Sequence, residues 1–264
     1  MLHHVVVGEG KPILILHGST LDHRHMMETV EPVFDVLEGW QRIYVDMPGH
    51  GQSPARDDIN TQDDLLAAVI EFATQAVPTQ PFAIIGESRG SYIAQGMVHL
   101  HPELVNGVAM LVPGGSPTAD PNRLPRHKVM EADPALRAEL TDRELASYEN
   151  FMVVQNPDIM DKWRRSKAPA RELWSAEQEE RVGAHFDFSF HLAGETTVFH
   201  GPSLIIAGLQ DRMSGHLDAI DLLTQFPRAT LAVLDAAGHG LAWERPDLVN
   251  ALLRDWLARL QKYS

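Results

Sequence analysis

The residues with the clearest catalytic potential lie in GESRG, residues 86–90. Ser88 stands between Gly86 and Gly90 in the pattern G-x-S-x-G, in which a strand turns abruptly into a helix and holds the serine at a strained corner. Two isoleucines before the pattern favour a strand, and the residues after it have helical periodicity. The pattern therefore predicts that Ser88 is a nucleophile exposed at the end of a strand.

A serine hydroxyl is a weak nucleophile unless a base takes its proton and a third group orients that base. His239, in DAAGHGLAWERP, follows a predicted strand and has a glycine on each side. Asp211, in IIAGLQDR, also follows a predicted strand, and Asp235 is the alternative acid. We therefore predict that Ser88, Asp211 and His239 form a catalytic triad for acyl transfer.

Short apolar segments alternate with amphipathic segments, and this alternation predicts the elements that position these residues. Strands are expected within residues 13–16, 42–46, 81–88, 106–115, 203–211 and 229–240. Helices are expected at about 26–37, at 63–76, directly after Ser88 and at about 248–260. The pattern is typical of an α/β fold with a mostly parallel, doubly wound sheet, whose sites lie at the carboxyl ends of the strands.

Two helices carry more detailed expectations. Pro32 should lie in the first turn of the helix near residues 26–37 or should break that helix. The helix after Ser88 should bury one apolar face, formed by Ile93, Met97, Leu100 and Leu104.

Residues 115–195 differ in character from the rest of the chain. The segment is rich in Pro, Arg and Glu, has helical stretches and contains no convincing buried strand. We therefore expect a helical cap at 115–195, inserted into a core formed by residues 1–114 and 196–264.

Three further segments extend the pattern around Ser88 to a family resemblance. LHGST (16–20) resembles the His-Gly oxyanion loop of the α/β-hydrolase family, DMPGHGQS (46–53) its D-x-P-G-H-G-x-S loop, and GHGLAWERP (238–246) its terminal G-H-x-x-x-x-E-x-P segment. Together with GESRG these segments occur in the family's order and span residues 16–246, nearly all of the core, while leaving the cap uncovered. The resemblance implies the α/β-hydrolase fold with a helical cap and an esterase-like serine hydrolase. In some members the acid follows the sixth strand, but LVPGGSPT offers no carboxylate there, which favours Asp211.

The resemblance also implies an oxyanion hole made by the backbone N–H groups of Ser19 and Arg89. Such donors stabilise the charge that develops on the substrate carbonyl oxygen. Ser91 departs from the family pattern, which usually has a second glycine at this position. Asp46, His50 and Ser53 are expected to organise their own loop through local hydrogen bonds.

The side chains of Glu87 and Arg89 leave two interpretations open. Arg89 could recognise a carboxylate or phosphate on the substrate through a two-pronged contact. Alternatively, it pairs with Glu87 or with an acidic cap residue. In the cap, Phe151 and Trp163 are the candidates to contact substrate, within a larger set of aromatic and thioether residues that could line an apolar pocket: Met130, Met152, Trp174, Phe186, Phe188 and Phe190.

Composition excludes several classes of function. The formal net charge of −14 argues against nucleic acid as a partner, and the absence of cysteine excludes disulfides, thiolate catalysis and Cys-ligated zinc. The first twelve residues have no basic region and only a short apolar run, and no segment has 18 uninterrupted apolar residues. We therefore expect a cytoplasmic protein that acts on a small molecule and does not bind a membrane, with a homodimer left open.

No cofactor or metal is expected. The histidine pairs His3/His4, His23/His25 and His99/His101 suggest metal ligands, but their sequence context completes no ligand set.

The residues favour a hydrolase of an uncharged carboxylic ester. Lactone hydrolysis, and carbon–carbon bond hydrolysis of a diketone-like acid, remain open alternatives on the same machinery. Serine at the elbow disfavours a haloalkane dehalogenase, which needs aspartate there, and HGST differs from the oxyanion loop of proline iminopeptidases. The alternative from a different class is a catalytically silent small-molecule receptor.

Overall fold

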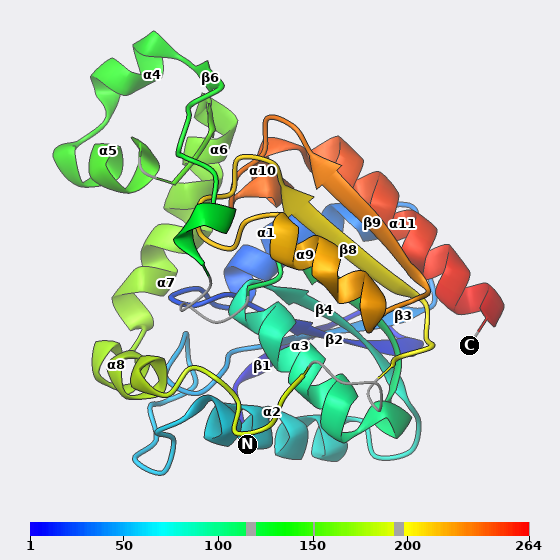
Figure 1. Cartoon of the computed structure of the whole chain (residues 1–264). Coiled ribbons are helices and arrows are strands. Elements are labelled where there is room, and N and C mark those ends of the chain that lie inside the picture. Colours follow the sequence, from blue (N-terminus) through cyan, green and yellow to red (C-terminus); the bar gives the residue numbers. More distant parts are fainter. Residues whose placement is uncertain (115–119, 150, 193–197, 264) are drawn as a thin grey trace.

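The structure, a computed structural model, describes residues 1–114, 120–149, 151–192 and 198–263. Seven strands form one sheet in the order β1-β3-β2-β4-β5-β8-β9 (Figure 1). The strands are β1 (His4–Val7), β2 (Lys11–Leu16), β3 (Trp40–Val45), β4 (Phe82–Glu87), β5 (Val105–Leu111), β8 (Ser203–Gly208) and β9 (Ala229–Leu234). Only β1 runs antiparallel to its neighbour β3, so the expected mostly parallel sheet is confirmed.

Helices cover both faces of the sheet, as Figure 1 shows. The core helices are α1 (His23–Phe34), α2 (Gln62–Ala76), α3 (Arg89–Leu100), α9 (Leu217–Asp221), α10 (Leu241–Glu244) and α11 (Pro246–Tyr263), with 3₁₀ turns η1 (Pro102–Leu104) and η4 (Leu222–Thr224). No helix among the described residues is both long enough and apolar enough to cross a membrane.

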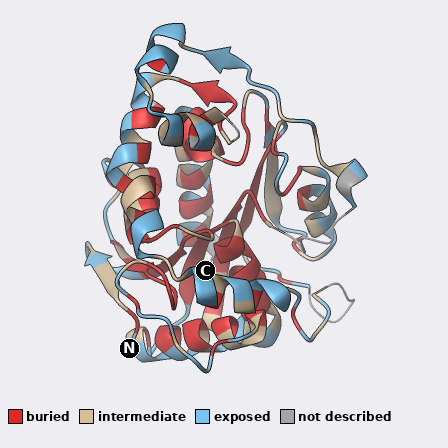
Figure 2. Ribbon diagram, turned by 90° about the vertical axis from the view of Figure 1, so that its left-hand side faces the viewer, coloured by how far each residue is buried: buried red, intermediate tan, exposed pale blue. Residues whose placement is uncertain are grey.

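Alternation along the strands divides the core into two apolar layers. Ile13 and Ile15 of β2 pack with α1 and α11 on one face, whereas Leu14 and Leu16 pack with α2 and α3 on the other. Figure 2 shows the strands as a buried centre between helices whose outer faces are exposed. The sheet is therefore a rigid support, and the residues that follow its strands are held at one edge.

Two helical expectations were wrong in detail. Pro32 lies in the last turn of α1, which continues to Phe34. The carbonyl groups of Pro32 and Val33 at the end of this helix have no partner in the next turn. They instead accept hydrogen bonds from Arg254 of α11, at 2.8 and 3.2 Å. The second expectation, that Leu100 belongs to the buried face of α3, was wrong because Leu100 is 44% exposed.

The apolar face of α3 is shorter than expected, because the helix ends at Leu100. Ile93 and Met97 are fully buried, while Leu104 belongs to η1 and is half-buried. The predicted face therefore holds only as far as the helix lies against the sheet.

The segment between β5 and β8 is largely helical. It contains η2 (Pro121–Arg123), α4 (Pro134–Glu139), α5 (Asp142–Glu149), α6 (Pro157–Lys162), the π-helical turn η3 (Trp163–Lys167), α7 (Ala168–Leu173) and α8 (Ala176–Ala184). The predicted boundaries at 115 and 195/196 lie outside the described residues. We call the described part of this segment, 120–149 and 151–192, the cap region.

The cap region also contains one feature that the sequence did not reveal. Two-residue strands β6 (Glu131–Ala132) and β7 (Val154–Gln155) pair with each other in parallel. Both residues of β7 are buried, so a short strand escaped notice because it is too brief to show a pattern.

Backbone strain is concentrated at the carboxyl edge of the sheet. Among the described residues, the four non-glycine residues with positive φ are Thr20, Ser88, Val112 and Ala236. They follow β2, β4, β5 and β9 respectively. Such backbone conformations cost of order 1–3 kcal/mol each and gather at functional sites, so this edge is where a site is expected.

Candidate active site

Ser88 lies at the corner between β4 and α3 with φ 51° and ψ −116°. The corner requires glycine on both sides. A Cβ at Gly86 would lie 2.5 Å from the Gly90 carbonyl carbon, and a Cβ at Gly90 would lie 2.3 Å from the Leu16 carbonyl oxygen. The two glycines therefore let β4 and α3 approach closely enough to leave Ser88 at the exposed tip.

The departure at Ser91 has a structural reason. Its fully buried hydroxyl donates to the carbonyl oxygens of Gly86, at 2.7 Å, and Leu111, at 3.1 Å. The hydroxyl thus connects the ends of β4 and β5 directly beneath the corner. Serine at this position keeps the side chain small and adds hydrogen bonds that glycine cannot make.

The structure brings Ser88, His239 and Asp211 together. His239 Nε2 lies 3.0 Å from Ser88 Oγ, and His239 Nδ1 lies 2.9 Å from Asp211 Oδ2. Asp235 instead accepts a hydrogen bond from Gln210 at 2.8 Å. Asp211 therefore takes the orienting position that the sequence left between two acids.

Asp211 is itself fixed in place. It is fully buried, and its Oδ1 accepts the backbone N–H groups of Met213 and Ser214 at 2.8 and 3.2 Å. These bonds leave Oδ2 facing His239, so Nδ1 carries the proton and Nε2 is free to accept one from Ser88.

The pKa of His239 is raised. Burial acts to lower this pKa, but the charge of Asp211 and its hydrogen bond together outweigh burial. The neutral imidazole that catalysis requires therefore forms at a higher pH than in an ordinary histidine.

This shift predicts the acid limb of the pH profile. The kcat/KM for a neutral ester should rise with pH through a midpoint above about 6.5, the ordinary histidine pKa, because protonated His239 cannot accept the Ser88 proton. Initial rates from pH 5 to 9 with two esters that differ in leaving group should give the same midpoint. A midpoint below 6, or one that changes with the leaving group, would contradict the assignment.

Ser19 and Arg89, the expected oxyanion donors, line the same cavity as Ser88. No acceptor within the described part of the chain takes the backbone N–H of either residue. Arg89 begins α3, where the first N–H groups have no partner in the helix, so its N–H is available to a ligand.

His17 shapes the loop that carries Ser19. Its Nε2 accepts the N–H of Met47 at 3.0 Å, and its Nδ1 donates to the Gly18 carbonyl at 2.7 Å. Burial lowers the pKa of His17 to about 3, so the ring stays neutral and connects the two loops at any working pH. His17 therefore fixes the loop that carries Ser19.

A cavity of about 660 Å³ opens over Ser88 and His239. Its core side is formed by residues at or after the ends of β2, β4, β5, β8 and β9, and its opposite side by the cap region. The cap residues in its lining are Leu124, Ala146, Phe151, Lys167, Arg171 and Phe186. This size suits a small molecule.

The Arg89 side chain pairs with an acidic cap residue. Its two terminal nitrogens lie 2.6 and 2.7 Å from the carboxylate oxygens of Glu179 in α8, and its guanidinium lies 5.3 Å from the ring centre of Phe186. Arg89 is 4% exposed. The structure thus places the guanidinium in a contact between core and cap, and we do not propose that it recognises substrate.

The two cap aromatics predicted to contact substrate lie in different places. Phe151 lines the cavity, edge-on to the His239 ring at 5.5 Å between centroids. Trp163 does not line it, because the first residue of the π-helical turn directs its side chain into the core layer of α1 and α11. The expectation for Trp163 was therefore wrong.

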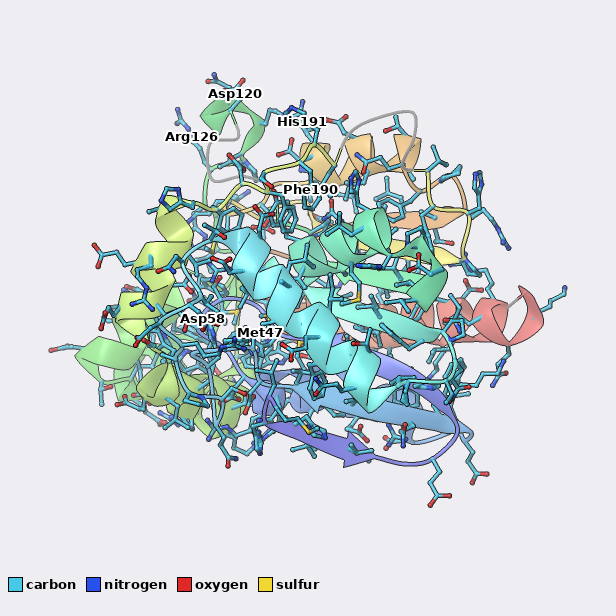
Figure 3. The ribbon with its side chains drawn as sticks, turned by 90° about the horizontal axis from the view of Figure 1, so that it is seen from below. Met47, Asp58, Asp120, Arg126, Phe190 and His191 are labelled. Carbon is cyan, nitrogen blue, oxygen red and sulfur yellow. The ribbon has the colours of Figure 1, made fainter. Side chains whose placement is uncertain are left out.

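Most of the other cap aromatics fasten residues 186–190 to α3. Phe186 and Phe188 stack on Tyr92 at 5.3 and 4.3 Å, and Phe190 stacks on His99 at 4.7 Å. Figure 3 shows Phe190 and the neighbouring His191 from below. Only Phe186 of this group also reaches the cavity.

The sequence did not predict the surroundings of two residues in the cavity lining, Glu87 and Lys167. Glu87 does not pair with Arg89: both of its carboxylate oxygens lie 2.9 Å from His25 Nε2. Burial acts to raise the pKa of Glu87, but His25 lowers it overall. Lys167 was missed because a lysine in a charged helix is normally an exposed residue, and nothing in the sequence signals its burial.

Glu244 of the GHGLAWERP segment connects the histidine loop to the cap region. Its Oε2 accepts the N–H of Gly238, and its Oε1 accepts the N–H groups of Val153 and Val154, at 2.6, 2.6 and 3.3 Å. One buried carboxylate thus fixes the residue before His239 and the start of β7.

Loss of this carboxylate should destabilise the protein. Glu244→Ala leaves three backbone N–H groups without their acceptor, and we expect a loss of about 3 kcal/mol in the free energy of unfolding. Urea unfolding followed by circular dichroism measures it, with the exposed Glu180→Ala of α8 as a control that should change stability by less than about 0.5 kcal/mol. Equal midpoints for wild type and Glu244→Ala would contradict this role.

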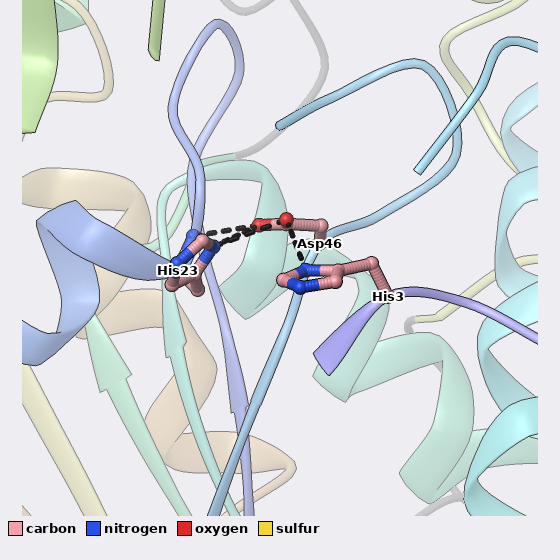
Figure 4. A group of neighbouring side chains, drawn as sticks. All are labelled: His3, His23 and Asp46. Atoms are coloured by element: carbon pink, nitrogen blue, oxygen red, sulfur yellow. Dashed lines mark hydrogen bonds and ion pairs between the residues drawn. The ribbon is translucent and has the colours of Figure 1, made fainter. Parts of the chain in front are cut away.

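His3, His23 and Asp46 form a cluster that the histidine pairs in the sequence did not predict (Figure 4). The Nδ1 atoms of His3 and His23 lie 2.7 and 2.9 Å from Asp46 oxygens, which also accept the N–H groups of His23 and Gln52. Burial acts to raise the pKa of Asp46, but these hydrogen bonds lower it overall. The contacts are those of a hydrogen-bond network, and we propose no metal there.

The other members of this loop also make local contacts. Ser53 donates to the Asp46 carbonyl at 2.7 Å, and His50 Nδ1 bonds the Pro48 carbonyl at 3.0 Å. The loop after β3 is therefore organised by its own polar residues and is joined to His17 through the N–H of Met47.

Comparison with known proteins agrees with this geometry. Residues 11–246 match the family described as alpha/beta hydrolase fold, and the chain belongs to this family of hydrolases. It is 23% identical to the (E)-2-((N-methylformamido)methylene)succinate hydrolase of Acinetobacter baylyi, over 97% of this chain and 93% of that protein. It is 25% identical to 2-hydroxy-6-oxononadienedioate/2-hydroxy-6-oxononatrienedioate hydrolase 1 of Pseudomonas putida, over 97% and 91%.

Among solved structures, an alpha/beta superfamily hydrolase from Oenococcus oeni PSU-1 has the same fold. The TM-score is 0.87 at 22% sequence identity, and the match covers 98% of this chain and 96% of that chain.

Proposed function

We propose that the protein is a serine hydrolase that cleaves a small carboxylic ester by acyl transfer. The observation that carries this proposal is the continuous hydrogen-bond chain from Ser88 through His239 to buried Asp211. Ser88 and His239 line the cavity between the core and the cap region. Each group has the contact that its role requires.

The geometry fits a two-step reaction. His239 Nε2 takes the proton of Ser88 as Oγ attacks the substrate carbonyl, and returns it to the leaving alcohol. The same nitrogen then takes a proton from water as the water oxygen attacks the acyl carbon, and returns that proton to Ser88 Oγ as the acyl group leaves as an acid. Asp211 holds the imidazole and stabilises its positive charge, while the N–H groups of Ser19 and Arg89 face the developing oxyanion.

Carbon–carbon bond hydrolysis of an acidic diketone is the second candidate. It is favoured by the name of the Pseudomonas putida relative, a hydrolase of a 2-hydroxy-6-oxo dienedioate. Glu87, which lines the cavity next to Ser88 and is paired with His25 behind it, adds a second acid–base pair that an ester hydrolase does not need.

A hydrolysis screen of short-chain nitrophenyl esters, lactones and vinylogous diketone acids distinguishes these candidates. Turnover of esters by wild type, and none by Ser88→Ala, supports the first proposal. Turnover of the diketone acids alone supports the second. No turnover of any class, with fluorophosphonate unreactive at Ser88, would favour the silent receptor.

A further inference from the structure

The cavity contains one buried cation that the proposed reaction does not use. Lys167 lines the cavity, yet only 7% of the residue is exposed. Its Nζ lies 3.4 Å from the ring centre of Phe151, which in turn contacts His239. Within the described part of the chain, no carboxylate lies within ion-pair distance of this ammonium group.

The neighbouring acids are already engaged by other groups. Glu87 is bound by His25, and Glu244 accepts three backbone N–H groups. Burial lowers the pKa of Lys167 to about 7, with Glu87 and Glu244 acting to raise it and Arg171 to lower it. A buried ammonium group held only by an aromatic face is costly unless a ligand anion completes its environment.

The remaining lining charges also favour an anion. The Arg89 guanidinium is paired with Glu179, and the Asp218 carboxylate is paired with Arg123. Lys167 is joined in the lining by the exposed side chain of Arg212. The cavity therefore presents positive charge, although the chain as a whole is strongly acidic.

The backbone is specialised at this position. Lys167 ends the π-helical turn η3, in which the N–H of Ala168 bonds to the Trp163 carbonyl. Pro169 follows, and in a regular α-helical turn its ring would clash with the Arg165 carbonyl. The widened turn changes the direction of the helix face so that Lys167 faces the cavity while Trp163 packs into the core; turns of this kind occur frequently at functional sites.

We propose that Lys167 is a specificity residue that binds a carboxylate on the substrate, so that the preferred substrate of Ser88 is an acidic ester or acidic acyl compound. This inference rests on the proposed hydrolase function and adds its substrate class. Phe151 contacts both the ammonium group and the His239 ring, so it fixes Lys167 close to the catalytic histidine.

Matched esters test the proposal. The 4-nitrophenyl monoesters of succinate, glutarate and adipate are compared with their neutral isosteres, the 4-nitrophenyl esters of 4-methylpentanoate, 5-methylhexanoate and 6-methylheptanoate. Wild type should prefer at least one acidic ester in kcat/KM. Lys167→Met should reduce this preference by about 10- to 100-fold, the range for a lost hydrogen bond to a charged group, with the neutral ester within about 3-fold of wild type.

Two variants serve as controls. Lys167→Arg keeps the charge and should keep most of the preference. Lys162→Met removes the same charge from α6, outside the cavity lining, and should leave the preference unchanged. In addition, kcat/KM for the acidic ester should fall above about pH 7 as Lys167 loses its proton, and this alkaline limb should be absent for the neutral ester and in Lys167→Arg.

The proposal is overturned if wild type does not prefer any acidic ester, or if Lys167→Met slows acidic and neutral esters equally. Failure of the hydrolase function is distinguished by calorimetry. If wild type hydrolyses none of the six esters, glutarate is titrated into full-length Ser88→Ala and into Ser88→Ala/Lys167→Met. Binding by the first alone supports the anion site without the reaction, and equal heats, or none, refute it.

Discussion

Ser88→Ala is expected to lower kcat for a short-chain nitrophenyl ester by on the order of 10⁴- to 10⁶-fold. Loss of the nucleophile removes nearly all of the catalysis that the three triad residues provide together. The corner at Ser88 tolerates alanine, since among the described residues His239 is the one hydrogen-bond partner of the Ser88 hydroxyl. Stability should therefore stay within about 1 kcal/mol of wild type. Initial rates measure the loss, and urea unfolding checks that the variant is folded.

The matched control is Ser91→Ala, three residues further along the elbow. It removes two hydrogen bonds beneath the corner but leaves Ser88 and His239 in place, so we expect a loss of about 1 kcal/mol in stability and a change in kcat of less than about 10-fold. Equal turnover by wild type and Ser88→Ala would show that the observed hydrolysis does not use this serine.

Asp211→Asn is expected to lower kcat by about 10⁴-fold through the tautomer of His239, the effect measured for the equivalent change in a serine protease triad. In the wild type, the N–H groups of Met213 and Ser214 donate to Oδ1 of Asp211. In the variant these donors should bond the amide oxygen, because the amide NH₂ cannot accept a hydrogen bond from them. The amide NH₂ must then face His239 Nδ1, which becomes the acceptor, so that Nε2 carries the proton and cannot take one from Ser88.

The change should lower kcat with little effect on KM, because Asp211 does not line the cavity. Asp235→Asn is the control, since Asp235 bonds Gln210 and should leave kcat within about 2-fold. A larger loss in Asp235→Asn than in Asp211→Asn would reverse the assignment of the acid.

The elbow and the triad could be predicted because their determinants are local. A Cβ added at Gly86 or Gly90 would lie 2.5 or 2.3 Å from neighbouring backbone atoms, so glycine is required at both positions. The requirement is visible in the sequence as two glycines at a fixed spacing around Ser88. Asp211 and His239 follow β8 and β9 directly, and parallel strands bring their carboxyl ends to one edge. This rule does not separate Asp211 from Asp235, which follows β9, and it is the hydrogen bond to His239 that identifies Asp211 as the orienting acid.

The charged side chains could not be assigned, because their partners are distant in sequence. Arg89 meets Glu179 ninety residues later, and Glu87 meets His25 sixty-two residues earlier. Each pairing depends on how α8 and α1 pack on the core. A single sequence shows the presence of opposite charges but not which two lie together.

Trp163 and Lys167 show a further limit. Regular helical periodicity assigns helix faces at 3.6 residues per turn, but the π-helical turn at Trp163–Lys167 changes which residues face the cavity. Pro169 is the sequence signal for an irregular turn, although it does not specify the direction of the change. The cap residue predicted to contact substrate therefore packs in the core, and a lysine lines the cavity instead.

The central claim is that Ser88 is a nucleophile activated by His239, and labelling with a fluorophosphonate tests it most directly. The account predicts one label per chain by intact mass, located on the peptide that contains Ser88, and much slower labelling of Asp211→Asn and of His239→Ala. Wild-type protein that stays unlabelled, or a label on any other residue, would contradict it.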